Sequence, residues 1–225
     1  MSLLSWQRIS HPILCLVTQR SYASKQTLPN LVSTTIESGV NMVQLRERDL
    51  SFEELLILAL QLRIVTRGKA LFFVNGNVQV AIASEADGVQ LGEKDATVKS
   101  VRDTVGKNLL IGRSVHSVDG ALKAERQGAD ILTVGTIFPS LSKPGIDASG
   151  PDLLKRVAET VNTPFLAIGG IDGRKAAQAM QAGCQGVAVI SAILGSSNPR
   201  QATQVIWEEI SKAKASPHSI TKTRG

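Results

Sequence analysis

A single internal histidine marks the most chemically distinctive stretch of this chain, IGRSVHS at residues 111–117. The chain has three histidines, and the other two lie near its ends. His116 follows an apolar run at 109–111 that predicts a buried strand, and residues 118–127 predict the next helix. In parallel α/β folds, ligands bind at the carboxyl ends of the strands. Because imidazole exchanges a proton near neutral pH, His116 is a candidate acid–base group, with a packed surface histidine as the alternative.

Cationic and amide side chains stand at the same end of other predicted strands. Arg46 and Arg48 alternate with Leu45 and Glu47, so both guanidinium groups should point to one face. Guanidinium suits carboxylate or phosphate, and a salt bridge to the neighbouring strand is the alternative. Three more polar residues hold equivalent positions: Gln44, Asn75 and Ser114. This rim predicts an anionic small-molecule ligand, most simply a phosphate ester.

Two segments have the features of a phosphate site. Four residues follow the last two predicted strands: Gly169, Gly170, Ile190 and Ser191. This is the usual phosphate position of (β/α)8 barrels, where glycine admits the ligand to backbone N–H groups and a helix N-terminus faces it. Turn geometry is the alternative explanation of the glycine pair. The longest connection holds three further candidates: Ser140, Ser142 and Lys143. A loop this long predicts a lid over the ligand, with an exposed polar loop as the alternative.

Metal ligands are sparse around these residues. No second histidine and no cysteine pair stands near His116, which argues against a transition-metal site. Asp95 is the best candidate for a hard cation such as Mg²⁺, which prefers oxygen ligands. One carboxylate makes a weak site.

The elements that position these residues alternate regularly. Eight apolar runs predict strands, at 13–18, 42–46, 70–74, 88–91, 109–113, 131–134, 165–168 and 187–190. Helical segments separate and follow them, the last at 199–212, so we predict an α/β fold with a single (β/α)8 TIM barrel over residues 1–210. Residues 211–225 predict a basic, disordered tail. Four of the six net positive charges lie in the last fourteen residues, which contain no acid.

Composition narrows the class of protein. Aromatic residues make up only 4%, which argues against nucleic-acid binding through stacked bases. No apolar run approaches the ~18 residues of a membrane span, so no membrane partner is expected. The two cysteines, Cys15 and Cys184, suit small core positions in a reducing compartment. We therefore expect a cytoplasmic enzyme or binding protein.

Five motifs together give a specific resemblance. They are VQLRERD at 43–49, GVQLG at 88–92, TIFPSLSKP at 136–144, AIGGID at 167–172 and GVAVIS at 186–191. This set, in this order, resembles the thiamine-phosphate synthase superfamily from about residue 13 to residue 210. The resemblance implies a (β/α)8 barrel that binds thiamine precursors and forms a homodimer.

The superfamily has two main branches, and the motifs of this chain divide between them. The synthase joins a pyrimidine pyrophosphate to a thiazole phosphate and uses Mg²⁺, held by an Asp directly after an Asn and by a second Asp. Here Gly76 follows Asn75, leaving only Asp95, and Arg48 replaces the usual lysine. The stretch at 111–117 and the Asn-Gly pair resemble the TenI-type thiazole tautomerase, which needs no metal and whose matching histidine is the acid–base catalyst.

We therefore expect a thiazole tautomerase, an isomerase without a cofactor. In this hypothesis His116 moves a proton between two carbons of the dihydrothiazole, while Arg46 faces the substrate carboxylate. Gly169, Gly170, Ile190 and Ser191 would hold the phosphate under the 140–143 loop. A Mg²⁺-dependent thiamine-phosphate synthase and a non-catalytic regulator that binds thiamine precursors remain the alternatives.

Overall fold

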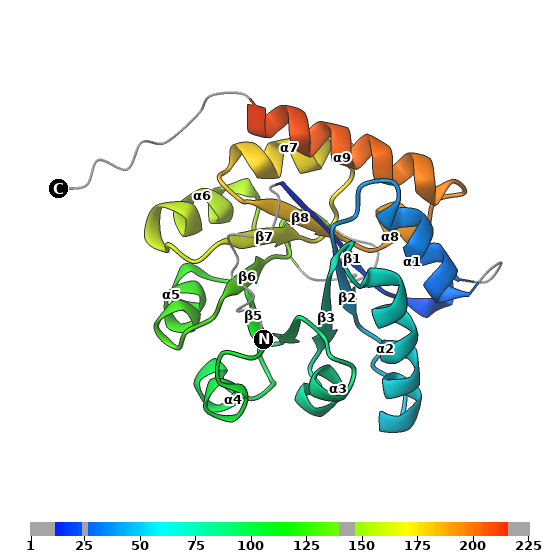
Figure 1. The fold of residues 1–225 in the computed structure, drawn as a ribbon. Helices are drawn as coiled ribbons and strands as arrows, with labels where there is room; N and C mark the ends of the chain where they lie inside the picture. Colours follow the sequence, from blue (N-terminus) through cyan, green and yellow to red (C-terminus); the bar gives the residue numbers. More distant parts are fainter. Residues whose placement is uncertain (1–11, 24–26, 140–146, 216–225) are drawn as a thin grey trace.

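The computed structural model describes residues 12–23, 27–139 and 147–215. Eight parallel strands form a closed barrel in the order β1 to β8, and helices surround it (Figure 1). The strands are β1 (Ile13–Val17), β2 (Met42–Leu45), β3 (Leu71–Asn75), β4 (Gly88–Leu91), β5 (Leu110–Val115), β6 (Ile131–Val134), β7 (Phe165–Ile168) and β8 (Gly186–Val189). The predicted (β/α)8 barrel is confirmed.

The helices lie outside the barrel and return the chain to the start of the next strand. They are α1 (Leu28–Ile36), α2 (Phe52–Thr66), α3 (Val78–Ala83), α4 (Val98–Val105), α5 (Val118–Arg126), α6 (Pro151–Thr160), α7 (Gly173–Gln181), α8 (Ser191–Leu194) and α9 (Pro199–Ala215). The sequence predicted neither the short α8 nor a 3₁₀ turn over Arg20–Tyr22. Helix α9 continues to Ala215, so the first residues of the expected disordered tail are helical, and 216–225 lie outside the described residues.

Side-chain alternation divides the apolar residues between two clusters. Ile13, Cys15 and Val17 of β1 belong to the cluster inside the barrel, whereas Leu14 and Leu16 pack against the helices. Burial on both sides explains why the strands are nearly continuous apolar runs. Burial also raises the pKa of the Cys184 thiol to about 12 and that of Cys15 further, which leaves both cysteines as protonated core residues.

Helix starts follow local hydrogen bonding. At α2 the Ser51 hydroxyl accepts the Glu54 N–H at 3.2 Å and the Glu54 carboxylate accepts the Ser51 N–H at 2.8 Å. This reciprocal capping box satisfies two backbone donors that the first turn leaves free. Of the described helices, none is long and apolar enough to cross a membrane.

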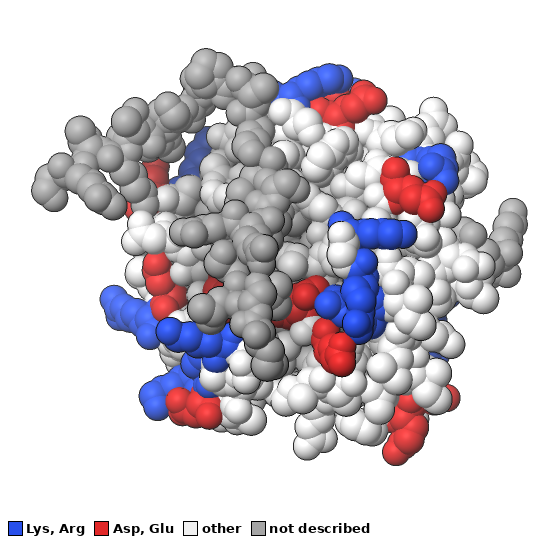
Figure 2. Space-filling view, viewed as in Figure 1, with Lys and Arg blue, Asp and Glu red and all other residues white. Residues whose placement is uncertain are grey.

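Charged side chains are interspersed over the face in Figure 2. The flank over α2 and α3, at the lower right of that view, carries few of them.

A buried ion pair anchors α2 to the barrel. The Asp87 carboxylate accepts from Arg63 Nη1 of α2 at 2.9 Å and from the Phe72 backbone N–H of β3 at 2.8 Å. Both side chains are largely buried, at 10% exposure for Asp87 and 15% for Arg63. Removing one partner of such a pair leaves the other charge buried without compensation.

We expect Asp87→Ala to lower the free energy of unfolding by about 3 kcal/mol, because Arg63 and the Phe72 N–H lose their acceptor together. Urea denaturation followed by circular dichroism measures this. The matched control is Asp103→Ala, which removes an exposed ion pair to Lys99 and should cost no more than about 0.5 kcal/mol. Equal losses in the two variants would contradict the anchoring role.

Candidate active site

Two adjoining cavities open at the carboxyl end of the barrel. The larger, of about 810 Å³, is lined mainly by strand ends and loops of β2 to β5 and the smaller, of about 530 Å³, mainly by those of β7 and β8. Ile168 and Ile190 line both cavities, so these two side chains form a shared apolar wall.

Alternation along the strands explains which side chains reach the larger cavity. Met42 of β2 and Phe73 of β3 point into the barrel, so Gln44 and Asn75, two residues further on, point the same way. The same parity extends to residues beyond the strand ends. The predicted residues that line this cavity are Gln44, Arg46, Arg48, Asn75, Asp95, Ser114, His116 and Ile190.

Arg46 and Arg48 form a cationic pair at the end of β2. Arg46 is half-buried, and its pKa is lowered by burial and then by the neighbouring Arg48 charge. Neither guanidinium makes a hydrogen bond or ion pair with the described part of the chain. The alternative of a salt bridge to a neighbouring strand is therefore wrong for both arginines. Two adjacent cations that line a cavity and form no ion pair with the described residues suit an anionic ligand.

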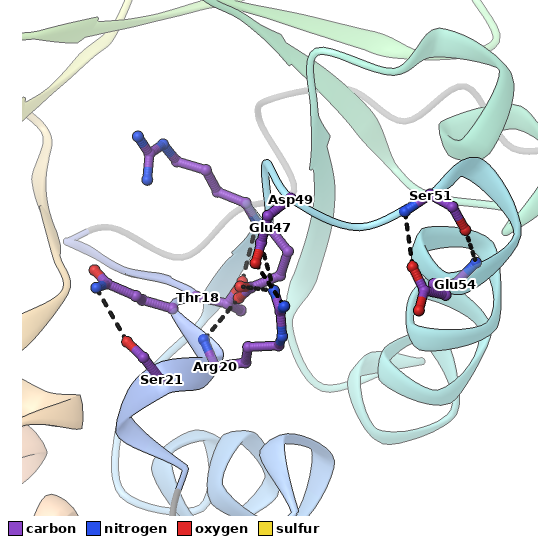
Figure 3. A network of polar contacts seen from close by, with 9 residues as sticks. Thr18, Arg20, Ser21, Glu47, Asp49, Ser51 and Glu54 are labelled. Atoms are coloured by element: carbon purple, nitrogen blue, oxygen red, sulfur yellow. Dashed lines mark hydrogen bonds and ion pairs between the residues drawn. The ribbon is translucent and has the colours of Figure 1, made fainter.

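Glu47, between the two arginines, is the residue whose importance the sequence analysis missed. Glu47 contributes to the lining of the larger cavity, but its carboxylate turns toward the end of β1 and accepts from the Thr18 hydroxyl at 2.8 Å and the Arg20 N–H at 3.0 Å (Figure 3). The Thr18 hydroxyl oxygen in turn accepts the Arg46 N–H at 3.0 Å. Glu47 is 9% exposed. This network fixes the backbone that carries Arg46.

Arg20 extends the same network to the loop before α2. Its guanidinium contacts Asp49 at 2.5 and 2.6 Å and Glu47 at 3.4 Å. The hydrogen bonds from Arg20 lower the pKa of the Asp49 carboxyl, and the two carboxylates raise the pKa of Arg20. Arg20 thus makes the salt bridges between the segments that follow β1 and β2, whereas Arg46 and Arg48 form no ion pair with the described residues. Side-chain alternation could have predicted this role of Glu47, because a carboxylate between two arginines that point to one face should point to the opposite face.

Two side-chain hydrogen bonds orient polar groups at the carboxyl end of the barrel. Gln44 Nε2 donates to Asn75 Oδ1 at 2.9 Å, and Gln90 Nε2 donates to the Ser114 hydroxyl at 3.1 Å. The Asn75 amide NH₂ and the Ser114 hydroxyl hydrogen remain available as donors, in keeping with an anionic or acceptor-rich ligand.

The smaller cavity contains the expected phosphate residues Gly169, Gly170, Ile190 and Ser191. Both glycines have positive φ, and a Cβ on Gly170 would lie 2.2 Å from the Pro139 carbonyl oxygen. Turn geometry and close backbone approach therefore require glycine here, whatever ligand binds. Lys175 also lines this cavity and was not predicted. Its ammonium lies 3.5 Å from Asp172 and 5.6 Å from the centre of the Phe138 ring.

His116 directly follows β5, which extends two residues further than predicted. Its Nδ1 contacts the Gly135 carbonyl oxygen. Its Nε2 lies 4.0 Å from Glu93, and the side chain is 44% exposed at the cavity edge. The imidazole ring therefore lies at the edge of the larger cavity, in contact with the loop after β6.

Asp95 is oriented by the loop after β4. Its Oδ2 accepts the Gly92 N–H at 2.6 Å. A Cβ on Gly76 would lie 3.5 Å from the same oxygen, so Asp95 faces the position where a second carboxylate is missing. In residues 12–23, 27–139 and 147–215, no group of three or more His, Cys, Asp or Glu side chains could hold a metal. Ser140, Ser142 and Lys143 lie outside the described residues.

Fold and site together define a (β/α)8-barrel protein with an anion-suited mouth. 3-Hexulose-6-phosphate synthase, at 18% identity and a TM-score of 0.69 over 88% of this chain and 99% of that one, shares the fold. More specifically, residues 14–193 match the family described as Thiamine monophosphate synthase, and the chain belongs to this family.

Individual relatives agree with the family assignment. The thiamine-phosphate synthase of Haloarcula marismortui is 40% identical over 204 residues, which cover 88% of this chain and 97% of that protein. The one from Clostridium tetani is 34% identical over 85% of this chain and 92% of its own. The structure of thiamine phosphate pyrophosphorylase from Pyrococcus furiosus superposes with a TM-score of 0.82 at 34% identity, covering 90% of this chain and 96% of that one.

These relatives correct the functional expectation. The superfamily and the prediction of an enzyme are confirmed, but the tautomerase, and with it the isomerase reaction, was wrong, because relatives at 34–40% identity over most of the chain are named thiamine-phosphate synthase. The prediction gave too much weight to His116 and to the glycine at position 76. The position of His116 at the cavity edge, with its ring bonded to a backbone carbonyl, does not by itself define a catalytic role.

We expect Glu47→Gln to weaken the binding of inorganic pyrophosphate about tenfold, because the neutral amide holds Thr18 and Arg20 less firmly and Arg46 loses its fixed backbone. Isothermal titration calorimetry measures this. Asp49→Asn is the matched control. It removes the exposed carboxylate that pairs with Arg20, and it should change the affinity less than threefold. An unchanged affinity in folded Glu47→Gln would show that the network does not position the arginines.

Proposed function

We propose that this chain is a thiamine-phosphate synthase, a transferase that joins a pyrimidine pyrophosphate to a thiazole phosphate. The observation that carries the proposal is the pair of adjoining cavities, one with unpaired arginines and one lined by glycines and Ser191. A coupling reaction between two phosphorylated substrates needs two phosphate-binding sites side by side, and the two cavities meet at a shared wall. The names of the relatives support the same activity.

The larger cavity would bind the pyrimidine pyrophosphate. Arg46 and Arg48 would pair with the diphosphate, which becomes the leaving group when the bond between its oxygen and the pyrimidine methylene carbon breaks. Positive charge held close to the departing anion stabilises the negative charge that develops on it. The donors left free on Asn75 and Ser114 would orient the same substrate.

Asp95 would hold the Mg²⁺ that the family resemblance implies. Its Oδ2 already accepts the Gly92 N–H, and one carboxylate is enough when substrate phosphates complete the coordination of Mg²⁺. The residues present therefore fit a metal ion that is bound jointly with the diphosphate. Such an ion supplies charge neutralisation at the leaving group.

The smaller cavity would bind the thiazole phosphate. Backbone N–H groups near Gly169 and Gly170 and the Ser191 hydroxyl are suitable donors for its phosphate. The shared wall of Ile168 and Ile190 lies between the two cavities, where the two rings would meet. The thiazole nitrogen attacks with its lone pair, so bond formation needs no proton transfer from carbon, and His116 would shape the rim.

Incubation of the protein with both phosphorylated precursors and Mg²⁺ tests the proposal directly. Thiamine phosphate and pyrophosphate should accumulate in equal amounts, measured by chromatography. Arg46→Ala should lower kcat/KM about 100-fold, and His116→Asn less than tenfold, because Arg46 would face the leaving group whereas His116 would only shape the rim. Absence of product from the wild-type protein would reject the function. A His116→Asn defect as large as that of Arg46→Ala would reject the assigned roles.

A second carboxylate at position 76 should strengthen metal binding. We expect Gly76→Asp to raise the affinity of the free protein for Mn²⁺, a probe for Mg²⁺, about tenfold, because the new side chain starts 3.5 Å from Asp95 Oδ2. Aspartate tolerates the positive φ at this position better than most residues. Calorimetry in the absence of substrate measures the affinity.

Gly68→Asp is the matched control, because Gly68 has nearly the same φ, +73° against +74°, with nothing within 4 Å of a Cβ. It should leave Mn²⁺ affinity unchanged. Equal affinities in both variants would contradict the position assigned to Asp95.

A further inference from the structure

Arg113 is a cation on the outward side of β5. Leu110 of the same strand points into the barrel, whereas Ile111 and Val115 pack on the side that faces the helices. Alternation therefore places Arg113 on the helix side, beside Leu91 at the end of β4. Arg113 is partly buried there and forms no ion pair with the described residues. A charge in this position needs other acceptors.

The acceptors are backbone carbonyls of the loop that carries Asp95. Arg113 Nη1 donates to the Ala96 carbonyl at 2.9 Å, and Nη2 donates to the Glu93 carbonyl at 3.1 Å. These carbonyls lie on either side of Lys94 and Asp95, so one planar guanidinium spans the turn between β4 and α4. Hydrogen bonds from a charged donor are stronger than those between neutral groups. The neighbouring strand thus holds both ends of the turn.

Asp95 has two further contacts inside this turn. Its backbone N–H donates to the Gly92 carbonyl at 3.1 Å, and its Oδ2 accepts the Gly92 N–H at 2.6 Å. These contacts orient the carboxylate within the turn, whereas the contacts of Arg113 orient the turn relative to β5. Together they aim the carboxylate at the larger cavity, which Asp95 lines.

The guanidinium of Arg113 acts at a distance from the ligand. The described residues that line the two cavities include Arg46, Arg48 and Asp95, but not Arg113. Any effect of Arg113 on a bound anion or cation must therefore pass through the turn that it holds.

We propose that Arg113 is a positioning residue for Asp95, which it aims at a divalent cation bound together with a diphosphate. The inference rests on the proposed function for the assignment of Mg²⁺ to Asp95. Residues that hydrogen-bond around a metal ligand typically change metal affinity about 10- to 100-fold. Because Asp95 is the one carboxylate assigned to the metal, its direction sets how much the metal adds to diphosphate binding.

The first test is calorimetry with inorganic pyrophosphate alone and with its preformed Mn²⁺ complex. In the wild type the complex should bind about tenfold more tightly, because the ion joins Asp95 to the diphosphate. Arg113→Met should reduce this gain to less than about twofold, since the carboxylate loses its direction. The metal-free affinity, which depends on Arg46 and Arg48, should stay unchanged. A general loosening of the barrel would lower both affinities.

Arg102→Met is the matched control. Arg102 also donates to backbone carbonyls, those of Gly106 and Leu109, and pairs with Asp130, but it does so where the chain enters β5 and β6. This variant should lose stability and keep the gain from Mn²⁺. Arg113→Lys keeps the charge without the planar fork and should recover part of the gain. Loss of the gain in Arg102→Met would attribute the effect to stability and overturn the proposal.

Amide hydrogen exchange of the metal-free protein, followed by NMR, reads the turn directly. The Gly92 and Asp95 N–H groups should exchange about tenfold faster in Arg113→Met than in the wild type, because the turn opens more often. The Val101 N–H, which donates to the Thr97 carbonyl in the first turn of α4, should exchange as in the wild type.

Three results would overturn the proposal: equal gains from Mn²⁺ in the wild type and Arg113→Met, unchanged exchange at Gly92 and Asp95, or a wild type whose affinity Mn²⁺ does not raise. Both measurements need only a metal ion and inorganic pyrophosphate, so they are independent of the coupling reaction. Absence of thiamine phosphate together with the expected binding and exchange would reject the synthase reaction and still support the role of Arg113.

Discussion

Side-chain alternation in a closed barrel is the constraint on which the rest of this structure depends. Each strand must send every second residue inward, and the eight strands are held in register around the ring. Inside, Ile13, Met42 and Phe73 fill the space with apolar volume. At the carboxyl end the same parity continues with amides and arginines. The packed core and the polar mouth are therefore successive layers of one pattern.

Glu47 shows how the pattern aims charges of opposite sign in opposite directions. Between Arg46 and Arg48, its carboxylate turns toward the end of β1, where Thr18 and Arg20 satisfy its oxygens. Had the carboxylate faced inward, it would have neutralised the arginines and removed their affinity for an anion. The buried hydrogen bond between Glu47 and Thr18 is thereby kept apart from the cationic pair of Arg46 and Arg48, although the residues are adjacent in sequence.

The sequence was sufficient to predict the barrel and most of its mouth, because apolar runs are local signals. Gln44, Arg46, Asn75 and Ser114 line the larger cavity, as expected from their positions at the carboxyl ends of strands. The apolar wall shared by the two cavities was not predictable, since Ile168 ends β7 and Ile190 follows β8, and only the folded barrel brings the two side chains together. The synthase and tautomerase branches share the barrel and its rim, so one absent carboxylate was a poor guide to the reaction.

Gln90 and Gly112 lie side by side on neighbouring strands, β4 and β5. A Cβ on Gly112 would come within 2.1 Å of Gln90 Oε1, so the amide occupies the volume that a side chain there would need. Gln90 in turn supplies the hydrogen bond to Ser114. Positions 90 and 112 are therefore coupled. A larger residue at position 112 requires a shorter side chain at position 90. Because Gln90 also orients the Ser114 hydroxyl, family members that change both positions would hold that hydroxyl differently.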